Sequence, residues 1–95
     1  MPDHVDAHFH DRVDAHIELA NEQLDDSTRT RVSTSMLYAT ARFHAWLGAC
    51  SFDDAAALAE ARDRLLAQFA AQFRDSLAEN LDDYIAHFDE YMTDN

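Results

Sequence analysis

The chain contains no lysine, and only one glycine, one proline and one cysteine among its 95 residues. Long loops and tight β-hairpin turns rely on glycine and proline, so both are disfavoured here. Strand-like alternation of apolar and polar residues is also absent. We therefore predict an all-α fold. The single cysteine, Cys50, excludes an intramolecular disulfide bond, as is usual for proteins of a reducing compartment.

The chain also lacks long apolar runs. No segment approaches the roughly 20 consecutive apolar residues that a transmembrane helix requires. The first four residues, MPDH, include an aspartate and do not begin the apolar run of a signal peptide. We therefore expect a cytoplasmic protein without membrane association.

Negative charge dominates the composition. Nineteen carboxylates face seven arginines, which gives a formal net charge of −12. Such a field repels phosphate backbones and anionic lipid, so nucleic acid and membrane surfaces are poor partners. It favours cations or a basic partner protein. The acidity also fits a solubility role or adaptation to high internal salt, where screening relieves the self-repulsion.

Apolar residues recur at steps of three and four and predict three helices in a single domain, residues 1–95. The helices span roughly 5–24, 30–50 and 53–92, and together they predict a three-helix bundle or helical hairpin. Residues 25–28 supply turn and capping groups, and Ser51 or Asp53 can cap the third helix. Cys50 ends the apolar seam of the second helix and is predicted to be a small core residue. The predicted core is Val13, Ile17, Leu24, Val32, Met36, Phe43, Trp46, Leu65, Phe69 and Phe73.

The third predicted helix is too long for a compact monomer. Forty helical residues span roughly 60 Å, whereas a compact 100-residue domain has a radius of gyration of about 13 Å. The helix either bends near Ser76–Asn80 or stays straight and packs its second half on another subunit. We favour the straight helix, since no glycine or proline marks a break, and therefore a homodimer. The predicted interface residues are Leu77, Leu81, Tyr84, Phe88 and Tyr91, with Ala41 and Ala45 on the small-residue face of the second helix.

Six histidines among the carboxylates raise the question of a metal site. His4 and His8 lie four residues apart, and Asp11 follows, so one helix face can present all three to an ion. Glu-x-x-His pairs typical of di-iron bundles are absent. Asp83 and His87 are also four apart and predict a carboxylate–imidazole pair, but the sequence ties no nucleophile to them. We therefore predict no catalytic residue and no cofactor.

Five segments of the chain form a recognisable combination. They are 9–12 (FHDR), 17–23 (IELANEQ), 35–39 (SMLYA), 41–46 (ARFHAW) and 79–85 (ENLDDYI). Together they resemble a family of short proteobacterial proteins grouped as a domain of unknown function. The resemblance covers most of the chain. It implies a small, soluble, helical bacterial protein and brings no activity, cofactor or catalytic residue with it.

Two functions remain after these exclusions, with an enzyme third. The first is a non-enzymatic protein–protein interaction module that acts as a homodimer and presents an acidic helical surface, including Asp82, Asp83, Asp89 and Glu90. The alternative is a cation- or metal-binding helical protein that uses its histidine-rich first helix.

Overall fold

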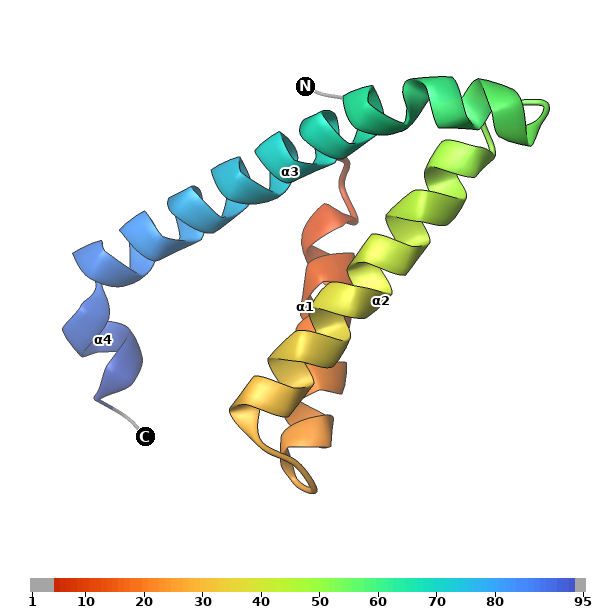
Figure 1. Cartoon of the computed structure of the whole chain (residues 1–95). Helices are drawn as coiled ribbons and strands as arrows, with labels where there is room; N and C mark the ends of the chain where they lie inside the picture. The colour runs from red at the N-terminus through yellow and green to blue at the C-terminus, as the bar shows by residue number, and fades with distance from the viewer. Residues whose placement is uncertain (1–4, 94–95) are drawn as a thin grey trace. The chain divides into compact units, whose positions relative to one another are not determined.

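A computed structural model describes residues 5–93, and within that range it contains four α-helices and no strand (Figure 1). They are α1 (Phe9–Leu24), α2 (Arg29–Ala49), α3 (Ala55–Ala86) and α4 (Phe88–Met92). The all-α prediction and the long third helix are confirmed. The chain divides into two compact units, Met1–Ala45 and Trp46–Asn95, so that α2 contributes to both.

The first unit contains α1, a short connection and most of α2. α1 ends in a hydrogen-bonded turn, because the backbone N–H of Asp25 donates to the carbonyl of Glu22 and the backbone N–H of Asp26 donates to the carbonyl of Gln23. The hydroxyl of Thr28 accepts a hydrogen bond from the backbone N–H of Arg31 at 3.2 Å, which satisfies a free donor at the start of α2. The predicted turn and capping role of residues 25–28 is therefore confirmed.

The second unit begins with the last turn of α2 and a five-residue connection to α3. Gly48 allows α3 to come close, since a Cβ atom at this position would lie 3.3 Å from Leu65 Cδ1. Cys50 follows the end of α2 and is exposed, so its predicted core position is wrong. α2 ends at Ala49, so the apolar seam of this helix does not reach Cys50.

α3 begins at a side-chain cap. The Asp54 carboxylate accepts a hydrogen bond from the backbone N–H of Ala57 at 2.8 Å, and the backbone of Asp54 is extended. This is the geometry of an N-cap residue. Asp54 therefore has the role that the sequence assigned to Ser51 or Asp53.

α3 is unbroken through Ser76–Asn80, where the sequence left a bend open. The Asn80 side-chain amide donates to the Ser76 carbonyl at 2.8 Å within the continuous helix. Its 32 residues span about 48 Å. The break comes later, at His87, whose φ of −125° and ψ of 29° lie outside the helical region. The predicted helix 53–92 is therefore two helices.

The predicted core residues differ widely in burial. Val32 is buried, along with two alanines, Ala20 and Ala61. Met36, Leu65 and Phe69 are half-buried. The other predicted core residues are exposed: Val13, Ile17, Leu24, Phe43, Trp46 and Phe73. Their assignment to a core stays a prediction, and it depends on further packing against their apolar faces.

None of the helices within residues 5–93 combines the length and the apolar content that a membrane span requires.

Candidate functional site

α3 carries two apolar faces, and the first is covered. It consists of Leu58, Ala61, Leu65 and Phe69, which follow one another at steps of three, four and four residues. Ala61 is buried and the other three are half-buried. This face includes the contact of Leu65 with Gly48, so it packs α3 within its own unit.

The second apolar face of α3 is open. Leu66, Phe73, Leu77 and Tyr84 are 57%, 45%, 46% and 50% exposed. Ala70 and Asn80 lie between these residues on the same face. From Leu66 to Tyr84 the six residues then follow one another at steps of four, three, four, three and four. This is the heptad spacing of a coiled-coil seam. We call this face the outer seam, and it consists of Leu66, Ala70, Phe73, Leu77, Asn80 and Tyr84.

Sequence reasoning did not separate the outer seam from the covered face. It assigned Leu65, Phe69 and Phe73 to the core and Leu77 and Leu81 to an interface, without dividing these residues between two faces of the helix. The signal that was missed is the heptad spacing that starts one residue later, at Leu66. Burial in the structure distinguishes Leu65, which is half-buried, from its neighbour Leu66, which is exposed.

The predicted interface residues fall on three elements. Leu77 and Tyr84 belong to the outer seam, and Leu81 lies beside it at 54% exposure. Phe88 and Tyr91 are exposed on α4. Ala41 and Ala45 are exposed on the part of α2 that belongs to the first unit. All seven are accessible among the described residues, and their role at an interface stays a prediction.

The junction of α3 and α4 holds a compact polar network. The predicted pair is present, because His87 Nδ1 lies 3.2 Å from Asp83 Oδ1. The Tyr91 hydroxyl donates to the same carboxylate, at 3.0 Å from Oδ2. The Tyr91 ring also meets the Tyr84 ring edge-on, with 4.9 Å between ring centroids. These contacts hold α4 against the last turns of α3.

The electrostatics of this network concern Tyr91 above all. Its hydrogen bond to the anionic Asp83 raises the pKa of the Tyr91 phenol, and desolvation adds to the effect. The imidazole of His87 lies beside the carboxylate of Asp83, and both side chains contact Tyr91. This geometry orients side chains and ends a helix. Among residues 5–93, the His87 imidazole has Asp83 as its hydrogen-bond partner and the Tyr91 ring beside it, and neither is the serine or cysteine nucleophile of a catalytic pair.

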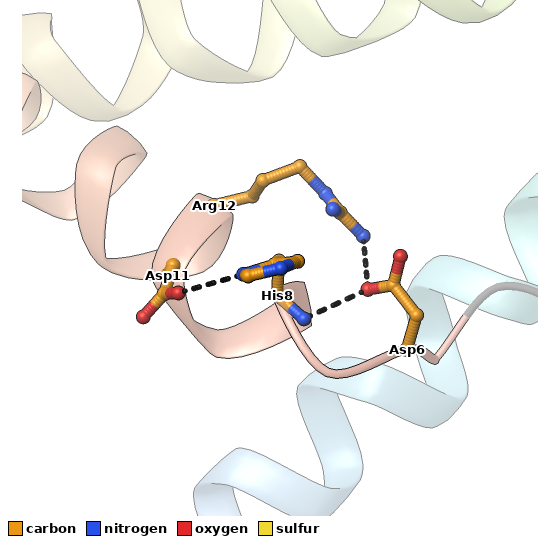
Figure 2. Close-up of polar contacts among 4 residues, drawn as sticks. All are labelled: Asp6, His8, Asp11 and Arg12. Carbon is orange, nitrogen blue, oxygen red and sulfur yellow. Dashed lines mark hydrogen bonds and ion pairs between the residues drawn. The ribbon is translucent and has the colours of Figure 1, made fainter.

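A second polar cluster lies at the start of α1 (Figure 2). His8 Nδ1 lies 3.3 Å from Asp11 Oδ2, and the Arg12 guanidinium donates to Asp6 Oδ1 at 2.9 Å. The Asp6 carboxylate also accepts the backbone N–H of His8. The hydrogen bond from Arg12 lowers the pKa of Asp6. These contacts tie the residues that precede α1 to its first turn.

This cluster contains part of the predicted metal site. His8 and Asp11 are close together, whereas His4 lies outside the described residues. Within residues 5–93, no group of three or more His, Cys, Asp or Glu side chains is arranged to hold a metal ion. A structural zinc site uses four ligands, so this imidazole and carboxylate alone make an incomplete site.

Charge is segregated along the chain, with arginines concentrated before residue 75 and carboxylates after it in the C-terminal half. α2 contains three arginines and no carboxylate. Residues 75–93 contain six carboxylates and no arginine. Within α3, the three arginines all precede residue 75 and four of the six carboxylates lie from residue 75 onward. The far half of α3, which carries Leu77, Asn80 and Tyr84 of the outer seam, is therefore its acidic half.

These features define a small, acidic, all-helical protein with an exposed heptad face. Residues 9–85 match the family described as Protein of unknown function (DUF3144). The chain therefore belongs to this family, which confirms the resemblance drawn from the five segments. The match ends just before His87, so the residues of α4 lie beyond it. No curated protein and no solved structure shows significant similarity to the chain.

Proposed function

We propose that this protein is a non-enzymatic protein–protein interaction module that acts as a homodimer. The observation that supports this proposal is the outer seam. Four large side chains at heptad spacing, Leu66, Phe73, Leu77 and Tyr84, are about half exposed on one face of a continuous helix. Exposed apolar faces of this length are typical of sites that bind another protein.

Helix length supports the same proposal. α1 and α2 have 16 and 21 residues, against 32 in α3. α3 is thus about 16 Å longer than α2, at about 1.5 Å per residue. Neither shorter helix can cover the whole of α3, whichever way it packs. A second copy supplies a helix of equal length.

Burial energetics point in the same direction. Among the described residues, no large side chain is fully buried, and the buried apolar residues are Ala20, Val32 and Ala61. Ordering a chain of this size costs on the order of 100 kcal/mol of conformational entropy, which burial of apolar surface must offset. Small chains with limited cores commonly gain the missing burial by association.

The acidic residues give the module its partner chemistry. The acidic residues at the end of α3 and in α4 are Asp82, Asp83, Asp89 and Glu90. The sequence has no arginine after residue 74 to neutralise them. This local charge favours a basic protein partner and disfavours nucleic acid and anionic membrane. We place the module in the cytoplasm, in line with its single cysteine.

The test is the molar mass in solution, measured by size exclusion with light scattering at low and high salt. We expect a dimer that Tyr84→Ala and Phe88→Ala weaken by about 30-fold in dissociation constant, since truncating a buried aromatic residue costs about 2 kcal/mol. Tyr38→Ala is the matched control, because Tyr38 is 71% exposed and lies outside the predicted interface. A monomer at every concentration and salt would contradict the proposal.

A further inference from the structure

We infer that the outer seam binds the outer seam of a second copy, with the two α3 helices antiparallel and the twofold axis near residue 75. This inference rests on the proposed homodimer and adds its register and direction. In this register, Leu66 meets the partner's Tyr84, Ala70 meets the partner's Asn80, and Phe73 meets the partner's Leu77. Each contact occurs twice, as a twofold interface requires.

The ends of the seam fix its centre. The heptad position before Leu66 is occupied by Asp63, which is 91% exposed and paired with Arg62 at 2.8 Å. A charged residue there ends the apolar run. At the other end, the next heptad position is His87, where α3 has already ended. The seam therefore runs from residue 66 to residue 84, and its midpoint is residue 75.

The side chains along the seam suit an antiparallel self-pairing. Large residues meet large ones at both ends and in the centre, and the small Ala70 meets the polar Asn80 in the layers between. The Asn80 amide is already hydrogen-bonded to the Ser76 carbonyl, so part of its polar capacity is satisfied within its own helix. A single polar residue in a heptad seam is a known determinant of register.

Charge selects the antiparallel direction. Residues 55–74 of α3 carry three arginines and two carboxylates, whereas residues 75–86 carry four carboxylates and no arginine. A parallel pair would place the two acidic halves side by side. An antiparallel pair places each acidic half beside the half that contains the arginines, which lowers the like-charge repulsion.

The test is disulfide formation between matched cysteine variants. All chains carry Cys50→Ser, because Cys50 is exposed and would otherwise cross-link. Ala70→Cys and Asn80→Cys are prepared separately, one with a different mass label, then mixed and oxidised. The matched control replaces Ala70→Cys by Ala71→Cys, since Ala71 is the neighbouring exposed alanine but lies on the opposite side of the helix.

We expect the mixed 70–80 disulfide, formed about tenfold or more above the level of the control mixture, since a disulfide requires Cα atoms within about 7 Å. Like-with-like 70–70 and 80–80 disulfides would overturn the antiparallel register while leaving the homodimer in place. A dimer that forms none of these disulfides would overturn the seam as the interface. A monomeric Cys50→Ser chain would instead overturn the proposed homodimer itself, and the seam would then be covered within one chain.

Discussion

The phenolic hydroxyl of Tyr91 donates a hydrogen bond to Asp83, with 3.0 Å between its oxygen and Asp83 Oδ2. Asp83 belongs to the last turn of α3 and Tyr91 to α4, so this bond spans the break at His87. It also draws the Tyr91 ring onto Tyr84, the last residue of the outer seam. The end of the seam and the start of α4 are therefore positioned by one carboxylate.

The first prediction concerns this bond. Asp83→Asn keeps the size of the side chain and replaces the anionic acceptor whose hydrogen bond, together with its charge, raises the pKa of Tyr91. We expect the Tyr91 phenol to titrate at lower pH in the variant, closer to an ordinary tyrosine. The measurement is the ultraviolet absorbance of tyrosinate during an alkaline titration. Tyr91→Phe identifies which part of the signal belongs to Tyr91.

The same shift predicts a pH dependence of stability. A pKa that is raised in the folded chain means that the folded state holds its proton more tightly than the unfolded state. The Tyr91 contact therefore contributes fully below the pKa of an unfolded tyrosine and is lost as pH rises through the folded pKa. We expect this alkaline loss to be smaller in Asp83→Asn. Equal losses in both chains would contradict the assigned cause.

The second prediction concerns the start of α3. Asp54→Ala removes the hydrogen bond to the Ala57 N–H, and we expect a loss of about 1 kcal/mol in the free energy of unfolding. For a chain of this size, that loss lowers the melting temperature by about 4–8 °C. Asp53→Ala is the matched control, because Asp53 is the adjacent aspartate and is not the cap. Equal effects at both positions, measured by circular dichroism, would show that charge rather than capping is responsible.

The third prediction concerns the approach of α2 to α3. Gly48→Ala gains up to about 1 kcal/mol of helix propensity, but its new methyl group must displace the end of the Leu65 side chain. Leu65→Ala removes that obstacle. We expect Gly48→Ala to be more stabilising in the Leu65→Ala background than in the wild type. Chemical denaturation of the four chains measures this coupling, and strict additivity would mean that the two residues are not in contact.

Particular residues show which parts of the structure were predictable from the sequence. The helical segments, the turn with Thr28 and the pairing of Asp83 with His87 were predicted, because capping preferences and steps of three or four residues act within a few positions of the chain. The sequence placed the cap of α3 at Ser51 or Asp53 instead of Asp54, since adjacent polar residues are equivalent candidates until the backbone is known. It placed Cys50 in the core because the end of α2 at Ala49 was not visible in the pattern.

The sequence by itself determined that this chain is all-α, acidic and built around one very long helix. Composition and periodicity are local properties, and scarce glycine and proline leave few other structures open. Only the tertiary structure decided which of Leu65 and Leu66 is covered, because that depends on Gly48 packing against one side of α3. It also decided that α3 stops at Ala86, where contacts among Asp83, His87 and Tyr91 replace the next helical turn.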